Sequence, residues 1–128
     1  METLNKGILS KLKGYRNGDG MTMPMIACKE NLTGCMVLFD EHKFDLNAQC
    51  NNGLTVVMYA CMYKLEKLAL NMITDYNCDF SLVTKNNDNV LTYACKFGLE
   101  ELALELLDYE NLDVNIKNKD GHRDVLHQ

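Results

Sequence analysis

The chain has 128 residues, a formal net charge of −5, one proline, no tryptophan and 47% hydrophobic residues. This length fits a single domain with a modest core, and the apolar content is too high for a disordered chain. The acidic balance argues against a broad nucleic-acid interface, and no apolar run reaches the roughly 18 residues that a membrane-spanning helix needs.

The N-terminal segment, residues 1–16, is basic, with four Lys or Arg against one Glu. Leu4, Ile8 and Leu12 share one helical face, which predicts a short helix that caps the unit after it. An amphipathic segment lying on a membrane surface is the alternative. The only apolar run here is too short for a secretory signal, so we expect an intracellular protein, cytoplasmic or nuclear.

Residues 17–49 are expected to form a first helix pair after a glycine-rich entry. Pro24 falls in the first turn of the first helix, where its missing N–H costs little. The second helix carries an apolar stripe of Leu32, Cys35, Met36 and Phe39.

Residues 50–83 show the same unit most clearly. Asn52-Gly53 is a turn signal, and the hydroxyl of Thr55 can cap the helix that follows. That apolar run breaks near Lys64, and a second run then places five apolar residues on one helical stripe: Leu65, Leu68, Ala69, Met72 and Ile73. The pattern predicts two antiparallel helices joined by a tight loop.

Residues 84–117 repeat this unit, with Asn89 in the capping position and Gly98 where the first helix ends. Lys64 holds the place of Gly98 one unit earlier, so we expect it in a left-handed, mildly strained conformation. A fourth unit, residues 118–128, has no second helix. It is either a natural half-repeat cap or an end that a partner or a second copy covers.

The units repeat at a fixed period. Ala27, Ala60 and Ala94 are each followed by Cys and are spaced by 33 and 34 residues. Three aspartates recur every 34 residues: Asp45, Asp79 and Asp113. A period of this length indicates a stacked solenoid, in which each unit buries its apolar face against its neighbours.

These units resemble the ankyrin repeat, whose pattern runs Asp-Gly-x-Thr-Pro-Leu-His-x-Ala. The matching segments read DGMTMPMIA, NGLTVVMYA, NNDNVLTYA and DGHRDVLHQ, and the resemblance covers residues 17–128. It implies an all-α, ankyrin-type helix-turn-helix solenoid with about three full repeats, an N-terminal capping helix and a C-terminal half-repeat. The family's His position holds Met25, Met58, Thr92 and Leu126. We therefore expect apolar packing to replace the inter-repeat hydrogen bonds that this His supports in the family.

The six cysteines follow the repeat. Cys28, Cys61 and Cys95 occupy one equivalent position per unit. Packed helices lie about 8–10 Å apart, farther than the roughly 7 Å that a disulfide spans, so we expect these three to be small core residues. Cys50 and Cys78 lie in turns and are expected to be accessible thiols. No zinc-site spacing is present and no cofactor is expected, and unpaired cysteines fit a reducing compartment.

No arrangement of residues indicates catalysis, so we expect the chain not to be an enzyme. The three histidines lie in a loop or at the chain end: His42, His122 and His127. The carboxylates of residues 100–108 read as a solvated helix face. What remains is a binding surface, and we expect the partner to be another protein rather than a nucleic acid or a membrane.

In the ankyrin family the concave side is built from turn tips and the exposed side of each first helix. The resemblance places there Tyr63, Phe97, Met62, Lys96, Leu54, Asn52, Lys85, Asn86, Asp88, Lys119 and His122. Tyr63 and Phe97 are equivalent positions one repeat apart, and exposed aromatic residues are typical of binding hot spots. The alternative is that both rings fold back onto neighbouring helices. Tyr59 and Tyr93 are expected in the core.

Leu70 and Leu104 interrupt the polar side of their helices at equivalent positions. They either wedge between repeats or form an outer apolar patch. The latter supports the alternative function, a structural or assembly protein that forms a homodimer through its open C-terminal end or its outer helices. The chain is expected to be a monomer or a weak homodimer. Its Asn- and Lys-rich, Met-for-His character resembles ankyrin proteins of large DNA viruses and some protists, which would make the partner a host protein.

Overall fold

The computed structural model describes residues 6–109, and this part of the chain is helical with no strand. The elements are α1 (Lys6–Gly14), α2 (Met23–Lys29), the 3-10 turn η1 (Thr33–Cys35), α3 (Met36–Glu41), α4 (Val56–Met62), α5 (Glu66–Thr74), α6 (Val90–Lys96) and α7 (Glu100–Leu106). The all-α prediction is confirmed over these residues. The predicted half-repeat, with Lys119 and His122, lies outside them, as does Leu4.

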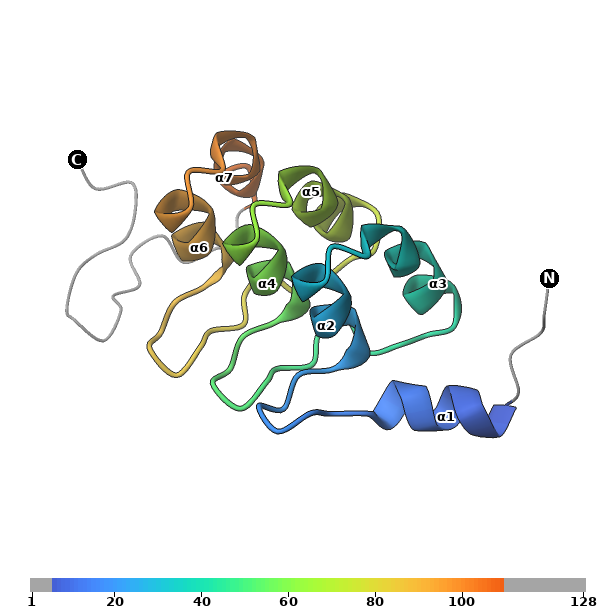
Figure 1. The fold of residues 1–128 in the computed structure, drawn as a ribbon. Coiled ribbons are helices and arrows are strands. Elements are labelled where there is room, and N and C mark those ends of the chain that lie inside the picture. Colours follow the sequence, from blue (N-terminus) through green and yellow to red (C-terminus); the bar gives the residue numbers. More distant parts are fainter. Residues whose placement is uncertain (1–5, 110–128) are drawn as a thin grey trace.

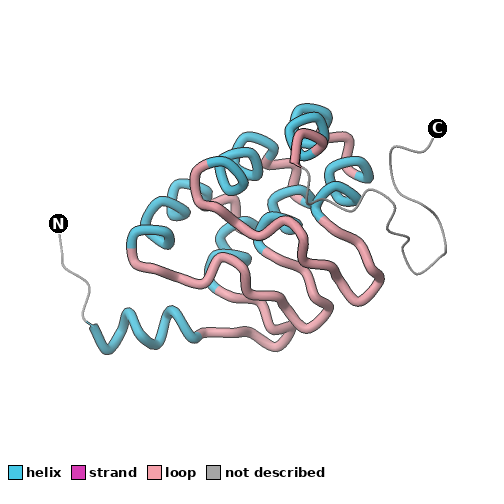
Figure 2. Tube along the Cα trace, turned by 180° about the vertical axis from the view of Figure 1, so that it is seen from behind, coloured by secondary structure: helices cyan, strands magenta, loops and turns pink. Residues whose placement is uncertain are grey.

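The helices stack in two rows (Figure 1). One row holds α2, α4 and α6, and α4 packs against both of its neighbours. The other row holds α3, α5 and α7, and α5 packs against α7. Each helix of the first row also packs on the helix that follows it in the chain. The long connections between units all project from the same edge of the stack (Figure 2).

The first helix of each pair begins at an equivalent cap: Thr22, Thr55 and Asn89. The Thr55 hydroxyl accepts a hydrogen bond from the Met58 N–H at 3.4 Å, and the Asn89 side chain accepts one from the Thr92 N–H at 2.9 Å. These bonds satisfy N–H groups that a helix start leaves without an intrahelical partner. These two caps therefore fix where α4 and α6 begin, as the sequence predicted, whereas Thr22 holds the same position without a side-chain cap bond.

The residues at the family's His position do more than pack. The cap N–H of Thr22 donates to Met25 Sδ at 3.4 Å, and that of Thr55 donates to Met58 Sδ at 3.4 Å. In the third pair the Asn89 N–H donates to Thr92 Oγ1 at 3.3 Å. Met25 and Met58 are fully buried, so they pack in the core as expected. Their thioether sulfurs, which are weak acceptors, also reach back to the cap of their own helix.

The first helices also end alike. Asn31, Lys64 and Gly98 follow them with φ values of 60°, 58° and 71°. The left-handed conformation predicted for Lys64 is thus present. Such a residue closes the helix by turning the chain back toward the second helix, and it costs a non-glycine residue some strain.

The connections that precede α2, α4 and α6 carry three turns of the same form, here called the fingers: residues 17–21, 50–54 and 84–88. Neighbouring fingers are joined through their backbones, since the Asn51 N–H donates to the Asp19 carbonyl and the Lys85 N–H donates to the Asn52 carbonyl, both at 3.0 Å. Gly53 has a φ of 87°, and a Cβ there would lie 2.9 Å from the Thr84 Cα. The fingers therefore form one hydrogen-bonded ribbon that needs glycine where two of them approach.

The core lies between the two rows of helices. Three of the cysteine predictions were wrong, those for Cys95, Cys50 and Cys78. Cys28 and Cys61 are buried as expected, and burial raises the pKa of each thiol to about 12. Cys95 is exposed, although it holds the equivalent position on α6. Cys28 Sγ lies 4.0 Å from the Val56 carbonyl of the next unit, whereas α6 is the last first-row helix of the described stack.

The two turn cysteines are buried instead of accessible. Cys50 lies beneath the Tyr59 hydroxyl, which donates to its sulfur at 3.4 Å. Burial also raises the pKa of Cys78 to about 12. Both residues lie in turns that the adjacent helices cover, so a turn position alone did not make a thiol accessible. Tyr59 itself is buried, as predicted.

Helix α1 lies beside α3 at the N-terminal end of the stack (Figure 1). Leu9 and Leu12 face the body, where with Phe39 and Phe44 they line an apolar cavity of about 120 Å³. Ile8, expected to share the buried face with Leu12, is 55% exposed. The helix turns its 9/12 edge inward, so Ile8 and Lys11 lie on its outer side.

Candidate protein-binding surface

Tyr63 and Phe97 both occupy the residue that ends a first-row helix, α4 and α6 respectively. Tyr63 is 40% exposed. Phe97 is half-buried and stacks on Tyr93, with ring centroids 6.0 Å apart and an interplanar angle of 28°. The two rings therefore differ: Tyr63 presents its ring to solvent, while Phe97 folds partly onto its own helix, which is the alternative that the sequence left open.

A charged pair lies beside these rings. Lys96 Nζ is 3.1 Å from Asp88 Oδ2 and 5.6 Å from the centroid of the Tyr93 ring. Tyr93 is half-buried rather than fully in the core. Burial, together with the Asp88 carboxylate, raises the pKa of Tyr93 to about 12. Lys96 thus links the base of the third finger to the aromatic surface of α6.

Asp88 was expected to be exposed at a finger tip, but it is buried. Its side chain is only 3% exposed. Its backbone N–H donates to Thr84 Oγ1 at 3.2 Å, which holds it at the base of the finger, and Oδ1 has no hydrogen-bond partner among the described residues. Burying a carboxylate requires compensation, and Lys96 supplies it. Asp88 therefore stabilises this surface from beneath, through its contact with Lys96.

The remaining predicted site residues fall into three groups. Asn52, Lys85 and Asn86 are exposed on the fingers. Leu54 and Met62 are half-buried and pack against the core. Lys119 and His122 lie outside the described residues. The exposed predicted site residues that the structure describes are thus the finger polar groups, Tyr63 and Lys96.

The fingers that carry these polar groups are fixed by side chains as well as by backbone. The Gln49 amide donates to the Gly53 and Val83 carbonyls, both at 2.9 Å. Arg16 donates to the Gly20 and Gln49 carbonyls, also at 2.9 Å. These bonds span three successive fingers, so the surface is held in one shape before any partner arrives.

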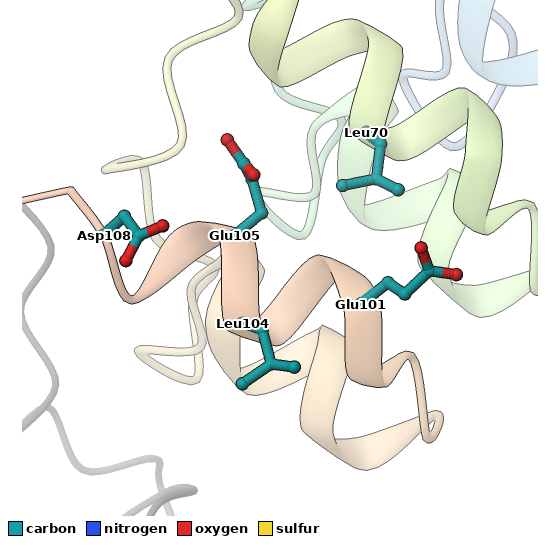
Figure 3. Close-up of a pocket in the computed structure, with 5 residues that line it drawn as sticks. All are labelled: Leu70, Glu101, Leu104, Glu105 and Asp108. Carbon is teal, nitrogen blue, oxygen red and sulfur yellow. The ribbon is translucent and has the colours of Figure 1, made fainter.

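A second surface lies on the opposite row of helices. Leu70 of α5, three residues of α7 and Asp108 line an open groove of about 320 Å³ (Figure 3). Leu70 is half-buried, whereas Leu104 is 60% exposed, so the pair does not wedge fully between units. Val37 of α3 is exposed at the equivalent position and extends this apolar row. Sequence reasoning missed Val37, although the 33-residue spacing to Leu70 was visible.

Comparison with known proteins adds no identification. No protein-family model matches the chain, and no curated protein matches its sequence. Among the described residues no helix is long and apolar enough to cross a membrane, and no three His, Cys, Asp or Glu side chains gather as metal ligands would.

Proposed function

We propose that this chain is an ankyrin-type repeat protein that binds another protein through the fingers and the adjoining ends of α4 and α6. The assignment to the ankyrin type is supported by the finger, cap and left-handed positions that recur every 33 or 34 residues. The proposed surface comprises Asn52, Tyr63, Lys85, Asn86 and Lys96, with Phe97 partly exposed beside them.

The exposed ring of Tyr63 is the observation that carries the proposal. A tyrosine in this position caps α4 through its backbone N–H, which donates to the Tyr59 carbonyl at 3.1 Å, so the ring is not needed for the cap. Exposed tyrosine is enriched at protein interfaces because a large ring is ordered at little entropic cost. Truncation of such an anchor typically weakens binding by about 2 kcal/mol or more, against less than about 1 kcal/mol at the rim.

The scaffold beneath the ring favours binding as well. Binding to a mobile surface requires ordering side chains and loops, at about 0.5–1.5 kcal/mol for each immobilised side chain. Here the fingers are already joined to one another through Asn51, Lys85 and Gln49. Lys96 is likewise held by Asp88. Little further conformational entropy should therefore be lost when a partner binds, because these groups are already ordered in the free protein.

The test is affinity capture from cell lysate with wild type and single variants, quantified by mass spectrometry. Tyr63→Ala is compared with Tyr15→Ala, because Tyr15 is similarly exposed at 44% but lies between α1 and the first finger, outside the residues of the proposed surface. We expect a specific partner whose recovery falls at least about tenfold with Tyr63→Ala, the equivalent of about 1.4 kcal/mol, and stays unchanged with Tyr15→Ala. Equal recovery by both folded variants would exclude Tyr63 as an anchor.

A further inference from the structure

The two ends of the stack carry exposed surfaces of opposite charge. Helix α1, at the N-terminal end, presents Ile8 and Lys11 outward, and α7, at the other end of the described stack, presents leucine and carboxylates (Figure 1). We propose that copies of this chain associate head to tail, with the outer side of α1 from one copy docked in the α5/α7 groove of the next. This does not rest on the proposed partner surface.

The acceptor is the groove between α5 and α7. Glu101, Leu104, Glu105 and Asp108 follow one another at i, i+3, i+4 and i+7, which places them on one stripe along α7 (Figure 3). Leu104 leaves 60% of its surface exposed at the centre of this stripe, and Leu70 borders it from α5. The groove thus combines two leucines, one from each helix, with a row of carboxylates on α7.

These carboxylates have no cation beside them in the described part of the chain, where Lys96 and Asp88 form the only ion pair. Glu105 accepts only a long hydrogen bond, 3.4 Å, from the Tyr109 hydroxyl. Like charges along one stripe repel one another. A cation brought into the groove would therefore be stabilised by several carboxylates at once.

The donor is the outer side of α1. Ile8 and Lys11 are separated by three residues, so they lie on one face of the helix, and both are exposed. Lys13 is also exposed in the last turn, but it lies on the other side of the helix, so Lys11 is the cation that accompanies Ile8 on this face. Leu9 and Leu12 hold α1 to α3 by a neighbouring edge, about 100° around the helix from Ile8 and Lys11, so these two exposed residues can be covered without detaching the helix.

The two surfaces match in chemistry. Ile8 can cover Leu104 while Lys11 reaches the Glu101 and Glu105 carboxylates, which pairs an apolar centre with ionic contacts. A contact between two short helices buries less than the roughly 1,200 Å² of a stable interface, so the association is weak and concentration-dependent. The contact joins different surfaces on each copy, so it repeats into chains rather than closing as a symmetric dimer.

Multi-angle light scattering across a wide range of protein concentrations tests this directly. We expect the mass to rise above the 14.6 kDa monomer as concentration increases, and to fall back at high salt because exposed charges are screened. A donor-blocked variant, Ile8→Ser with Lys11→Glu, and an acceptor-blocked variant, Leu104→Ser with Glu105→Lys, should each remain monomeric. All four positions are exposed or line the open groove, and circular dichroism verifies that both variants fold.

Mixing the two blocked variants separates this arrangement from any symmetric one. Each variant retains one intact surface, so an equimolar mixture should reach twice the monomer mass and stop there. Two control variants, Lys29→Glu on α2 and Glu41→Lys on α3, change charge by the same amount outside both surfaces. They should associate like wild type. A wild-type mass that stays at 14.6 kDa at every concentration overturns the proposal. A mixture that remains monomeric overturns it too, because the contact would then be isologous or elsewhere.

Discussion

Two leucines of α7, two positions apart, should respond very differently to the same substitution. Leu102 is completely buried, whereas Leu104 keeps 60% of its surface in solvent. The helical register decides which of them faces the core. Leu102→Ala and Leu104→Ala therefore form a matched pair on one helix, with the same atoms removed in each case.

The expected magnitudes follow from burial. Leu→Ala removes three carbon atoms, and at about 0.8 kcal/mol per buried carbon the transfer cost is about 2.4 kcal/mol at Leu102. The cavity left in a packed interior brings the total to about 2–5 kcal/mol. At Leu104 water fills the space, and the loss should stay below about 1 kcal/mol. The Leu102 N–H, which donates to Glu66 Oε2 at 3.1 Å, is retained in the variant, so the measurement isolates packing.

Urea unfolding followed by circular dichroism measures both changes. With a slope of about 1–3 kcal/mol per molar urea, Leu102→Ala should lower the midpoint by about 1 M or more, and Leu104→Ala by much less. If the two variants unfold at the same urea concentration, or if Leu104→Ala is the less stable, the register of α7 against α5 and α6 described above is incorrect.

Three further outcomes are expected. Timed alkylation read by peptide mass spectrometry should label Cys95 well before Cys28 and Cys61, because only Cys95 is exposed; equal rates would contradict its position at the end of the stack. The pKa values of Cys28 and Cys61 are raised from 9.0 to about 12, so the thiols of the unfolded chain lose their protons at lower pH than those of the folded chain. The free energy of unfolding should therefore be unaffected by these thiols below pH 9 and should fall between pH 9 and pH 12 by about 1.4 kcal/mol per pH unit for each thiol. Urea unfolding in alkaline buffers measures this decline. Gly53→Ala should cost more stability than Gly98→Ala, since both have positive φ but only the Cβ at position 53 would meet the backbone of the next finger; equal losses would argue against that close approach.

The sequence predicted local features well because they depend on local chemistry. The caps at Thr55 and Asn89, the left-handed Lys64 and the early Pro24 follow from side chains and backbone angles within a few residues. The stripe that buries Ala69 and Met72 follows from helical periodicity.

Burial that depends on tertiary contacts was predicted poorly. Cys95 matches Cys61 in sequence, yet only Cys61 has a further described first-row helix packed beyond it. Cys50 lies in a turn, but a tyrosine hydroxyl nine residues later covers it. Asp88 looked like a tip residue and is instead the buried partner of Lys96. At Cys95 the difference lies in the neighbouring unit, whereas at Cys50 and Asp88 the deciding contact is a helix side chain eight or nine residues later in the same unit. Composition and the repeat pattern alone reveal neither.

Hydrogen exchange on the complex with a captured partner tests the proposed binding surface most directly. The chain is measured alone and with the purified partner, and protection is compared peptide by peptide. We predict that exchange slows in the fingers at residues 50–54 and 84–88 and around Tyr63, while α5 and α7 exchange as they do in the free protein. Slowing confined to α5 and α7, with the fingers and Tyr63 unchanged, would contradict the proposed function and place the partner on the outer row of helices.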